Sequence, residues 1–229
     1  MIVVVGNPIA RGGELGGGVA GTPARAAVAA ARTGATVQLV GKAGDDPAGD
    51  AVLLALAAAG VGHVAVLRDT THPTPIAVPA APLEPVFGWG DRELAAELVA
   101  DGEGGDAVRV VPETPAERPA LEPADVELAL RYLTEFRAVV VAEPLPEAVV
   151  AVVVEAASYS GAELVLVVAG SQRVPAPPGA LVLEAPDDDP DGAFATMLGE
   201  LAGAIDRGAT SAEAFRSMSD RVGLAPAAD

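Results

Sequence analysis

The stretch that decides the fold is residues 20–34, which read A-G-T-P-A-R-A-A-V-A-A-A-R-T-G. Thr22 and Pro23 are typical of a helix start, because threonine is a common N-cap and proline suits the first helical position, where no N–H donor is needed. The helix is expected to run through the alanines and to stop at the closing glycine. Apolar runs of strand length flank it, at residues 2–5 and 36–40. A strand–helix–strand order of this kind predicts a parallel sheet with right-handed crossovers.

The same alternation continues along the chain, apart from one stretch in the middle. Asp46 and Pro47 repeat the cap-and-proline signal and open a second helix. Residues 72–123 are rich in proline, glycine and acidic side chains, with weak periodicity, and are expected to form a lid or a long surface excursion. Apolar residues at helical spacing between 126 and 136 predict a helix after it. Further strands are expected at residues 64–67, 138–142, 163–168 and 180–183, and further helices at 147–158, 192–206 and from a capping box at 210–213 onwards.

Composition limits the class of protein. The 229 residues are 51% hydrophobic but 3% aromatic, so one core built from alanine, valine and leucine is expected. The chain has no cysteine, which excludes disulfides and thiolate chemistry, and its net charge of -18 argues against a nucleic-acid partner. No apolar run reaches the roughly 20 residues of a membrane span. The N-terminus begins as a strand and not as a signal peptide, so a cytoplasmic location is expected.

One glycine motif resembles a dinucleotide-binding fingerprint but is not interpreted as one. Gly16, Gly18 and Gly21 satisfy the pattern G-x-G-x-x-G. A dinucleotide-binding fingerprint needs its first glycine directly at the end of the first strand, whereas Gly16 lies about ten residues beyond that strand. We therefore expect a flexible hairpin at these residues and no dinucleotide site.

Several blocks resemble the ribokinase-type (PfkB) carbohydrate kinase family. Residues 20–34 are similar to its signature G-G-x-P-A-N-x-A-x-x-x-A-R-L-G, and residues 40–49, V-G-K-A-G-D-D-P-A-G, are similar to V-G-x-V-G-D-D-x-x-G. Pro73 and Thr74 resemble the P-T-G that leads into the lid. Residues 186–194, P-D-D-D-P-D-G-A-F, resemble the family's D-T-T-G-A-G-D-A-F more loosely.

The resemblance implies an architecture. We expect a single domain, residues 1–229, folded as a three-layer α/β/α sandwich of ribokinase type with a mainly parallel sheet and a small β lid. The lid is expected from residues of about 10–20 and 73–90. Many relatives dimerise through their lid strands, so a homodimer through the lid is expected here. Relatives use ATP and magnesium as cosubstrate and metal.

The chain departs from the family where the chemistry takes place. The family's catalytic aspartate corresponds to Gly192, which has no side chain to accept a proton, so no catalytic residue is assigned. The family's G-A-G anion hole corresponds to Asp189, Pro190 and Asp191. Proline lacks a backbone donor and the two carboxylates repel a phosphate, so this is expected to be a degenerate phosphate site. We therefore expect no ATP cofactor and no metal.

Two arginines replace sugar-binding residues of the family. Arg11 stands at the family's aspartate after the first strand, and Arg25 stands at the signature asparagine, beside Gly21. In the implied fold both arginines reach one pocket, where guanidinium groups keep their charge. A carboxylate or phosphate ligand would compensate that charge, and so would acids of the chain such as Glu14 or Asp45. Both alternatives stay open, as does the possibility that the arginines are simply solvated or paired at the surface.

The leading functional hypothesis is therefore a PfkB-like protein without kinase activity that acts as a binding or assembly module, with a small anion as the candidate ligand. One alternative is an active sugar or nucleoside kinase that phosphorylates a hydroxyl with ATP. Another is a dimeric scaffold without a ligand.

Overall fold

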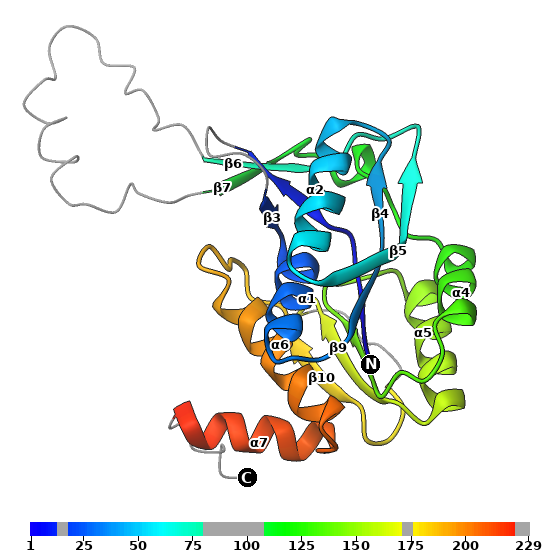
Figure 1. The fold of residues 1–229 in the computed structure, drawn as a ribbon, viewed down its shortest axis with the longest axis vertical. Helices are drawn as coiled ribbons and strands as arrows, with labels where there is room; N and C mark the ends of the chain where they lie inside the picture. Colours follow the sequence, from blue (N-terminus) through cyan, green and yellow to red (C-terminus); the bar gives the residue numbers. More distant parts are fainter. Residues whose placement is uncertain (13–17, 80–107, 171–175, 223–229) are drawn as a thin grey trace, which may run out of the picture.

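The computed structural model describes residues 1–12, 18–79, 108–170 and 176–222. Its centre is a six-stranded sheet with the strand order β10-β9-β8-β1-β4-β5, in which every neighbouring pair is parallel (Figure 1). All four residues of the central strand β1 are buried, because helices cover both faces of the sheet. The strands are β1 (Ile2–Val5), β4 (Val37–Gly44), β5 (Val61–Asp69), β8 (Ala138–Val141), β9 (Glu163–Val168) and β10 (Leu181–Glu184).

Two helical layers enclose this sheet. Alternate residues of β1 belong to different cores: Ile2 and Val4 pack with one layer, and Val3 and Val5 with the other. The first layer holds α1 (Thr22–Arg32), α2 (Pro47–Ala58), α6 (Ala193–Asp206) and α7 (Ser211–Val222), and the second holds α4 (Pro123–Tyr132) and α5 (Glu147–Ser160). The expected three-layer α/β/α sandwich is confirmed.

Small residues let two helices of the first layer approach closely. A Cβ atom on Gly199 of α6 would lie 2.5 Å from the Cβ atom of Ala29 and 2.6 Å from the backbone nitrogen of Ala30, both on α1. The alanines of α1 are buried on this side. The chain has few large aromatic side chains, and close contact between helix backbones fills this part of the core instead.

A second, smaller sheet forms the lid. It has the strand order β3-β2-β6-β7, with β3 (Gly18–Ala20), β2 (Ile9–Arg11), β6 (Ile76–Pro79) and β7 (Val108–Val111). Of the segments expected to form the lid, residues 13–17 and 80–90 lie outside the described residues. Strand β7 was not expected, because its four residues follow a long polar stretch that hides the strand pattern.

Two expectations about helix starts can be compared with the structure. Asp46 caps α2 as expected, since its carboxylate accepts a hydrogen bond of 2.7 Å from the backbone N–H of Gly49. Thr22 is not the N-cap of α1: Gly21 takes that position with a φ of 74°, and Thr22 is the first helical residue. The chain leaves β3 and enters the helix at once, and a side chain at Gly21 would collide with Ile9, so the sharp turn falls on glycine.

Two more expectations concern helix ends. The capping box of α7 is confirmed, because the backbone N–H of Thr210 donates to Glu213 and the backbone N–H of Glu213 donates to the Thr210 hydroxyl. The helix expected between 126 and 136 ends earlier, at Tyr132. Leu133 and Phe136 are buried although they follow the helix, so their apolar spacing reports burial and not helix length.

Among the described residues, no helix has the length and apolar character needed to cross a membrane. The same part of the chain contains no group of three or more histidine or acidic side chains arranged to hold a metal ion.

Candidate functional site

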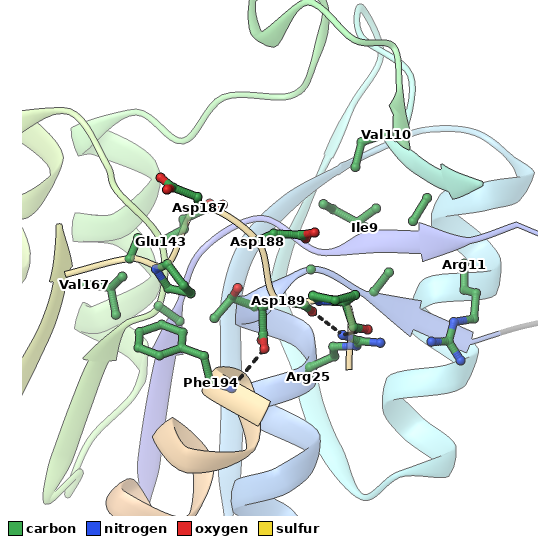
Figure 2. A pocket seen from close by; sticks show the side chains of 18 of the residues that line it. Ile9, Arg11, Arg25, Val110, Glu143, Val167, Asp187, Asp188, Asp189 and Phe194 are labelled. Carbon is green, nitrogen blue, oxygen red and sulfur yellow. Dashed lines mark hydrogen bonds between the residues drawn. The ribbon is translucent and has the colours of Figure 1, made fainter. Parts of the chain in front are cut away.

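A cavity of about 560 Å³ lies between the lid and the carboxyl ends of the parallel strands (Figure 2). Open α/β sheets bind their ligands at this edge. Four parts of the chain line the cavity: the lid, the start of α1, the ends of β8 and β9, and the loop that enters α6. They contribute, among others, Ile9, Arg11, Ala77, Val110, Gly21, Thr22, Arg25, Ala142, Glu143, Val167, Asp187, Asp188, Asp189, Pro190 and Phe194.

The N-terminus of α6 is occupied by a carboxylate of the same chain. One side-chain oxygen of Asp189 accepts a hydrogen bond from the backbone N–H of Phe194, and the other accepts one from Ala195, both at 3.0 Å. Backbone N–H groups at a helix N-terminus bind anions, and the helix dipole favours negative charge there. Asp189 thus occupies the helix N-terminus at which the sequence analysis expected a degenerate phosphate site.

Arg25 holds the loop that carries Asp189. Its Nη1 atom donates to the backbone carbonyls of Asp189 and Pro190, both at 3.0 Å, across 164 and 165 positions of sequence. These partners are neutral, and within the described residues Arg25 has no carboxylate oxygen closer than 4.0 Å. The guanidinium therefore fixes the loop through neutral carbonyl groups and forms no ion pair within the described residues.

Gly192 is buried directly beside Arg25. It is the N-cap of α6 and has a left-handed φ of 72°. A Cβ atom at this position would lie 2.8 Å from Nη1 of Arg25. The space in which a catalytic side chain would begin is therefore filled by the arginine. Asp191 is exposed and is not among the residues that line the cavity.

Arg11 and Arg25 line the same cavity, as expected from the sequence. Arg11 is the last residue of β2 and is exposed, and Figure 2 shows it on the lid side, farther than Arg25 from the loop of Asp187–Asp189. Asp45 does not pair with either arginine: its carboxylate lies 3.2 Å from Arg68 instead. The other proposed acid, Glu14, lies outside the described residues.

Glu143 is a site residue that the sequence analysis did not single out. It follows β8 at the floor of the cavity, and its carboxylate accepts a hydrogen bond of 2.7 Å from the backbone N–H of Asn7. Burial raises the pKa of Glu143 from an ordinary 4.5 to about 7, although this hydrogen bond and the charge of Arg118 both act to lower it. An acid placed two residues after a buried strand was the available signal, because such residues reach the ligand-binding edge.

The side chain of Asn7 connects the floor of this site to its surroundings. Its amide nitrogen donates to the carbonyl of Pro119 at 3.0 Å, and its amide oxygen accepts from the backbone N–H of Lys42 at 2.9 Å. The Lys42 ammonium in turn pairs with Asp125 of α4 at 2.6 Å. Asn7 therefore has a structural role and holds in place the backbone that positions Glu143.

Comparison with known proteins supports the sequence resemblance. The family model described as "pfkB family carbohydrate kinase" matches residues 3–80. The PfkB resemblance is confirmed. No curated protein matches the sequence of this PfkB-like chain.

Solved structures show the fold. A protein described as Sa239 is 14% identical with a TM-score of 0.66, and the match covers 100% of this chain and 95% of that one. The fructokinase from Xylella fastidiosa is 20% identical with a TM-score of 0.50, covering 88% of this chain and 57% of its own. A fructokinase double mutant from Vibrio cholerae O395, in a form with bound fructose, ADP and potassium ion, is 16% identical with a TM-score of 0.50, covering 72% and 49%. The PfkB-like chain thus spans about half of the length of these fructokinases.

Proposed function

We propose that this PfkB-like chain binds a small anionic ligand in its cleft and does not transfer phosphate. The observation that carries the first half of this proposal is the cavity lined by Arg11 and Arg25, neither of which has a carboxylate partner among the described residues. Arginine binds carboxylates and phosphates through forked, charge-assisted hydrogen bonds. A ligand with either group would supply the negative partner that these arginines lack among the described residues.

The loop that enters α6 supports the proposed absence of phosphate transfer. Transfer to a hydroxyl needs a group that accepts its proton and donors that stabilise the charge of the moving phosphoryl group. Gly192 has no side chain, and the N–H groups of Phe194 and Ala195 already donate to Asp189. A phosphoryl group at this helix would have to displace the carboxylate and then bear its repulsion.

The kinase alternative is tested by calorimetry with ATP and magnesium and by an ADP-release assay with a panel of sugars and nucleosides. We expect no ADP release with any acceptor and a dissociation constant for ATP weaker than about 1 mM. Micromolar ATP binding with turnover of one acceptor would establish the kinase alternative.

Anion binding is tested by thermal unfolding with sulfate, phosphate and a series of organic acids. We expect a stabilising shift that exceeds the effect of sodium chloride at equal ionic strength, and we expect Arg11→Gln to reduce it. Arg109→Gln is the matched control, because Arg109 lies on the same lid but points away from the cavity. Its neighbour Val110 lines the cavity, and successive strand residues point to opposite faces. A shift that is unchanged in Arg11→Gln contradicts the proposal.

We further infer that the lid mediates a homodimer. In the described part of the lid, β3 and β7 are the outer strands, and each pairs with a neighbour on one side. Unpaired strand edges tend to be covered in native proteins, and pairing with a second copy covers them.

A further inference from the structure

The charged side chains of the cleft are sorted by sign. Glu143 follows β8, and Asp187 and Asp188 lie in the loop after β10. Arg11 comes from the lid strand β2, and Arg25 comes from α1. Figure 2 shows Glu143 and Asp187 toward one end of the cavity and Arg11 toward the other, with Asp188 and Arg25 between them. The cavity therefore has an acidic end and a basic end.

The two ends do not neutralise one another. Within the described residues no nitrogen of Arg11 or Arg25 lies within 4.0 Å of a carboxylate oxygen of Glu143, Asp187 or Asp188. Asp187 and Asp188 are exposed, and the described part of the chain offers neither of them an ion-pair partner. In contrast, Asp189, which also lines the cavity, accepts hydrogen bonds from the N-terminus of α6.

A purely anionic ligand would suit only part of this cavity. Its negative charge would be attracted to the arginines, but the carboxylate of Asp188, and that of Glu143 in its ionised form, would repel any negative group placed at the opposite end. A purely cationic ligand would meet the reverse problem at Arg11. Carboxylates accept hydrogen bonds from ammonium groups, and guanidinium groups donate to phosphates and carboxylates.

Building on the proposed function, we propose that the ligand is bipolar. It carries a phosphate or carboxylate that faces Arg11 and Arg25, and a primary ammonium group that faces Asp188 and Glu143. The body between the two groups contacts the apolar walls formed by Ile9, Val110 and Phe194. A cavity of about 560 Å³ has room for a molecule of the size of a sugar phosphate.

Four hexoses separate the contributions of the two ends. Glucose carries neither charged group, glucosamine carries the ammonium, glucose 6-phosphate carries the phosphate, and glucosamine 6-phosphate carries both. We expect calorimetry to show glucosamine 6-phosphate binding about tenfold more tightly than glucose 6-phosphate, which corresponds to one charge-assisted contact. Glucosamine and glucose are expected to bind more weakly than either phosphate.

Variants assign each preference to one end of the cavity. Asp188→Asn is expected to remove most of the preference for glucosamine 6-phosphate over glucose 6-phosphate, and Arg11→Gln is expected to remove most of the preference for phosphate. Asp191→Asn is the control for the acidic end, because Asp191 belongs to the same loop, is exposed and does not line the cavity. Arg109→Gln is the control for the basic end. Neither control is expected to change any of the four affinities.

The outcomes distinguish this inference from the proposed function. If both phosphates bind equally and both depend on Arg11, the anion site stands and the bipolar ligand is wrong. If the preference for the amine persists in Asp188→Asn and in Glu143→Gln, the acidic end does not supply it and the inference is overturned. If none of the four compounds binds, the inference and the proposed anion site both fail for ligands of this size.

Discussion

The guanidinium of Arg25 lies where a side chain at Gly192 would begin, with 2.8 Å between Nη1 and a Cβ atom at the glycine. The two residues come from α1 and from the N-cap of α6, and the contact replaces the catalytic side chain that the family resemblance would place there. Restoring an acid at Gly192 by itself is therefore not expected to restore a usable base. The arginine would first have to move away from the carbonyls of Asp189 and Pro190.

This contact can be measured with a double-mutant cycle. Gly192→Ala is expected to lower the free energy of unfolding by about 2 kcal/mol, because a left-handed φ costs a residue with a Cβ atom about 1–2 kcal/mol and the contact with Arg25 adds to this. In an Arg25→Ala background the cost is expected to fall to about 1 kcal/mol, the part that belongs to the backbone. Urea denaturation gives the four free energies.

A second glycine is the control for this cycle. Gly60 has a similar φ of 76°, but nothing lies within 4 Å of a Cβ atom there. Gly60→Ala should therefore cost the backbone part alone, with or without Arg25. Equal costs of Gly192→Ala in the two backgrounds would show that Arg25 does not restrict this position.

Removing the internal anion should open its site to an external one. Asp189→Ala is expected to lower the free energy of unfolding by about 1 kcal/mol, the usual cost of losing a helix cap. Sulfate or phosphate should then bind to the freed N–H groups of Phe194 and Ala195 and stabilise the variant more than the wild type. The measurement is the thermal shift of both proteins over a sulfate titration.

Asp187→Ala is the matched control for that titration. Asp187 carries the same charge in the same loop, but among the described residues it forms no hydrogen bond to α6. It should respond to sulfate as the wild type does. An equal gain in Asp187→Ala and Asp189→Ala would mean that the loop's general charge, and not the helix cap, excludes anions.

Glu143 makes stability depend on pH near neutrality. Its pKa is raised to about 7 in the folded protein, so the folded state holds the proton more tightly than the unfolded chain, whose group titrates near 4.5. The stabilising effect of the proton is present below pH 4.5 and is lost as the pH rises toward 7. Glu143→Gln mimics the protonated form at every pH, so its free energy of unfolding relative to that of the wild type should rise as the pH rises. We expect a rise of about 2 kcal/mol across this interval. This is less than the full pKa shift would give, because the cavity is open to water.

Urea denaturation of both proteins at a series of pH values tests this. Glu147→Gln serves as the control, because it removes the same charge from an exposed position at the start of α5. A constant difference between Glu143→Gln and the wild type from pH 4.5 to 7.5 would contradict the raised pKa of Glu143.

The lid homodimer predicts a particle of twice 22.7 kDa by light scattering at micromolar concentrations. Val111→Lys should shift the particle toward the monomer, because Val111 is a 41% exposed apolar residue of the outer lid strand β7. Val64→Lys is the control, since Val64 is 82% exposed on β5, the outer strand of the main sheet. A 22.7 kDa particle at every concentration tested would refute the dimer.

The architecture was open to prediction from the sequence because its signals are local. A buried strand of a parallel sheet is a short continuous apolar run, and Asp46 with Pro47 announces a helix within two residues. Interactions of this kind depend on neighbours in the chain and so leave a readable pattern. The lid strand β7 was missed for the converse reason, since its pairing with β6 is defined by a partner about thirty residues away.

The sequence by itself led, through its resemblance to the family, to the prediction that a glycine stands at the catalytic position and that acids and a proline stand at the anion hole. Only the tertiary structure decided what these replacements do. In the structure, Asp189 caps α6, and Arg25 binds carbonyls 164 and 165 positions away. The sequence alone left open whether acids of the chain or a ligand face this arginine. The raised pKa of Glu143 likewise arises from burial beside a backbone N–H 136 positions away. Burial and electrostatic environment depend on which distant segments pack together, and no local pattern of residues specifies that packing.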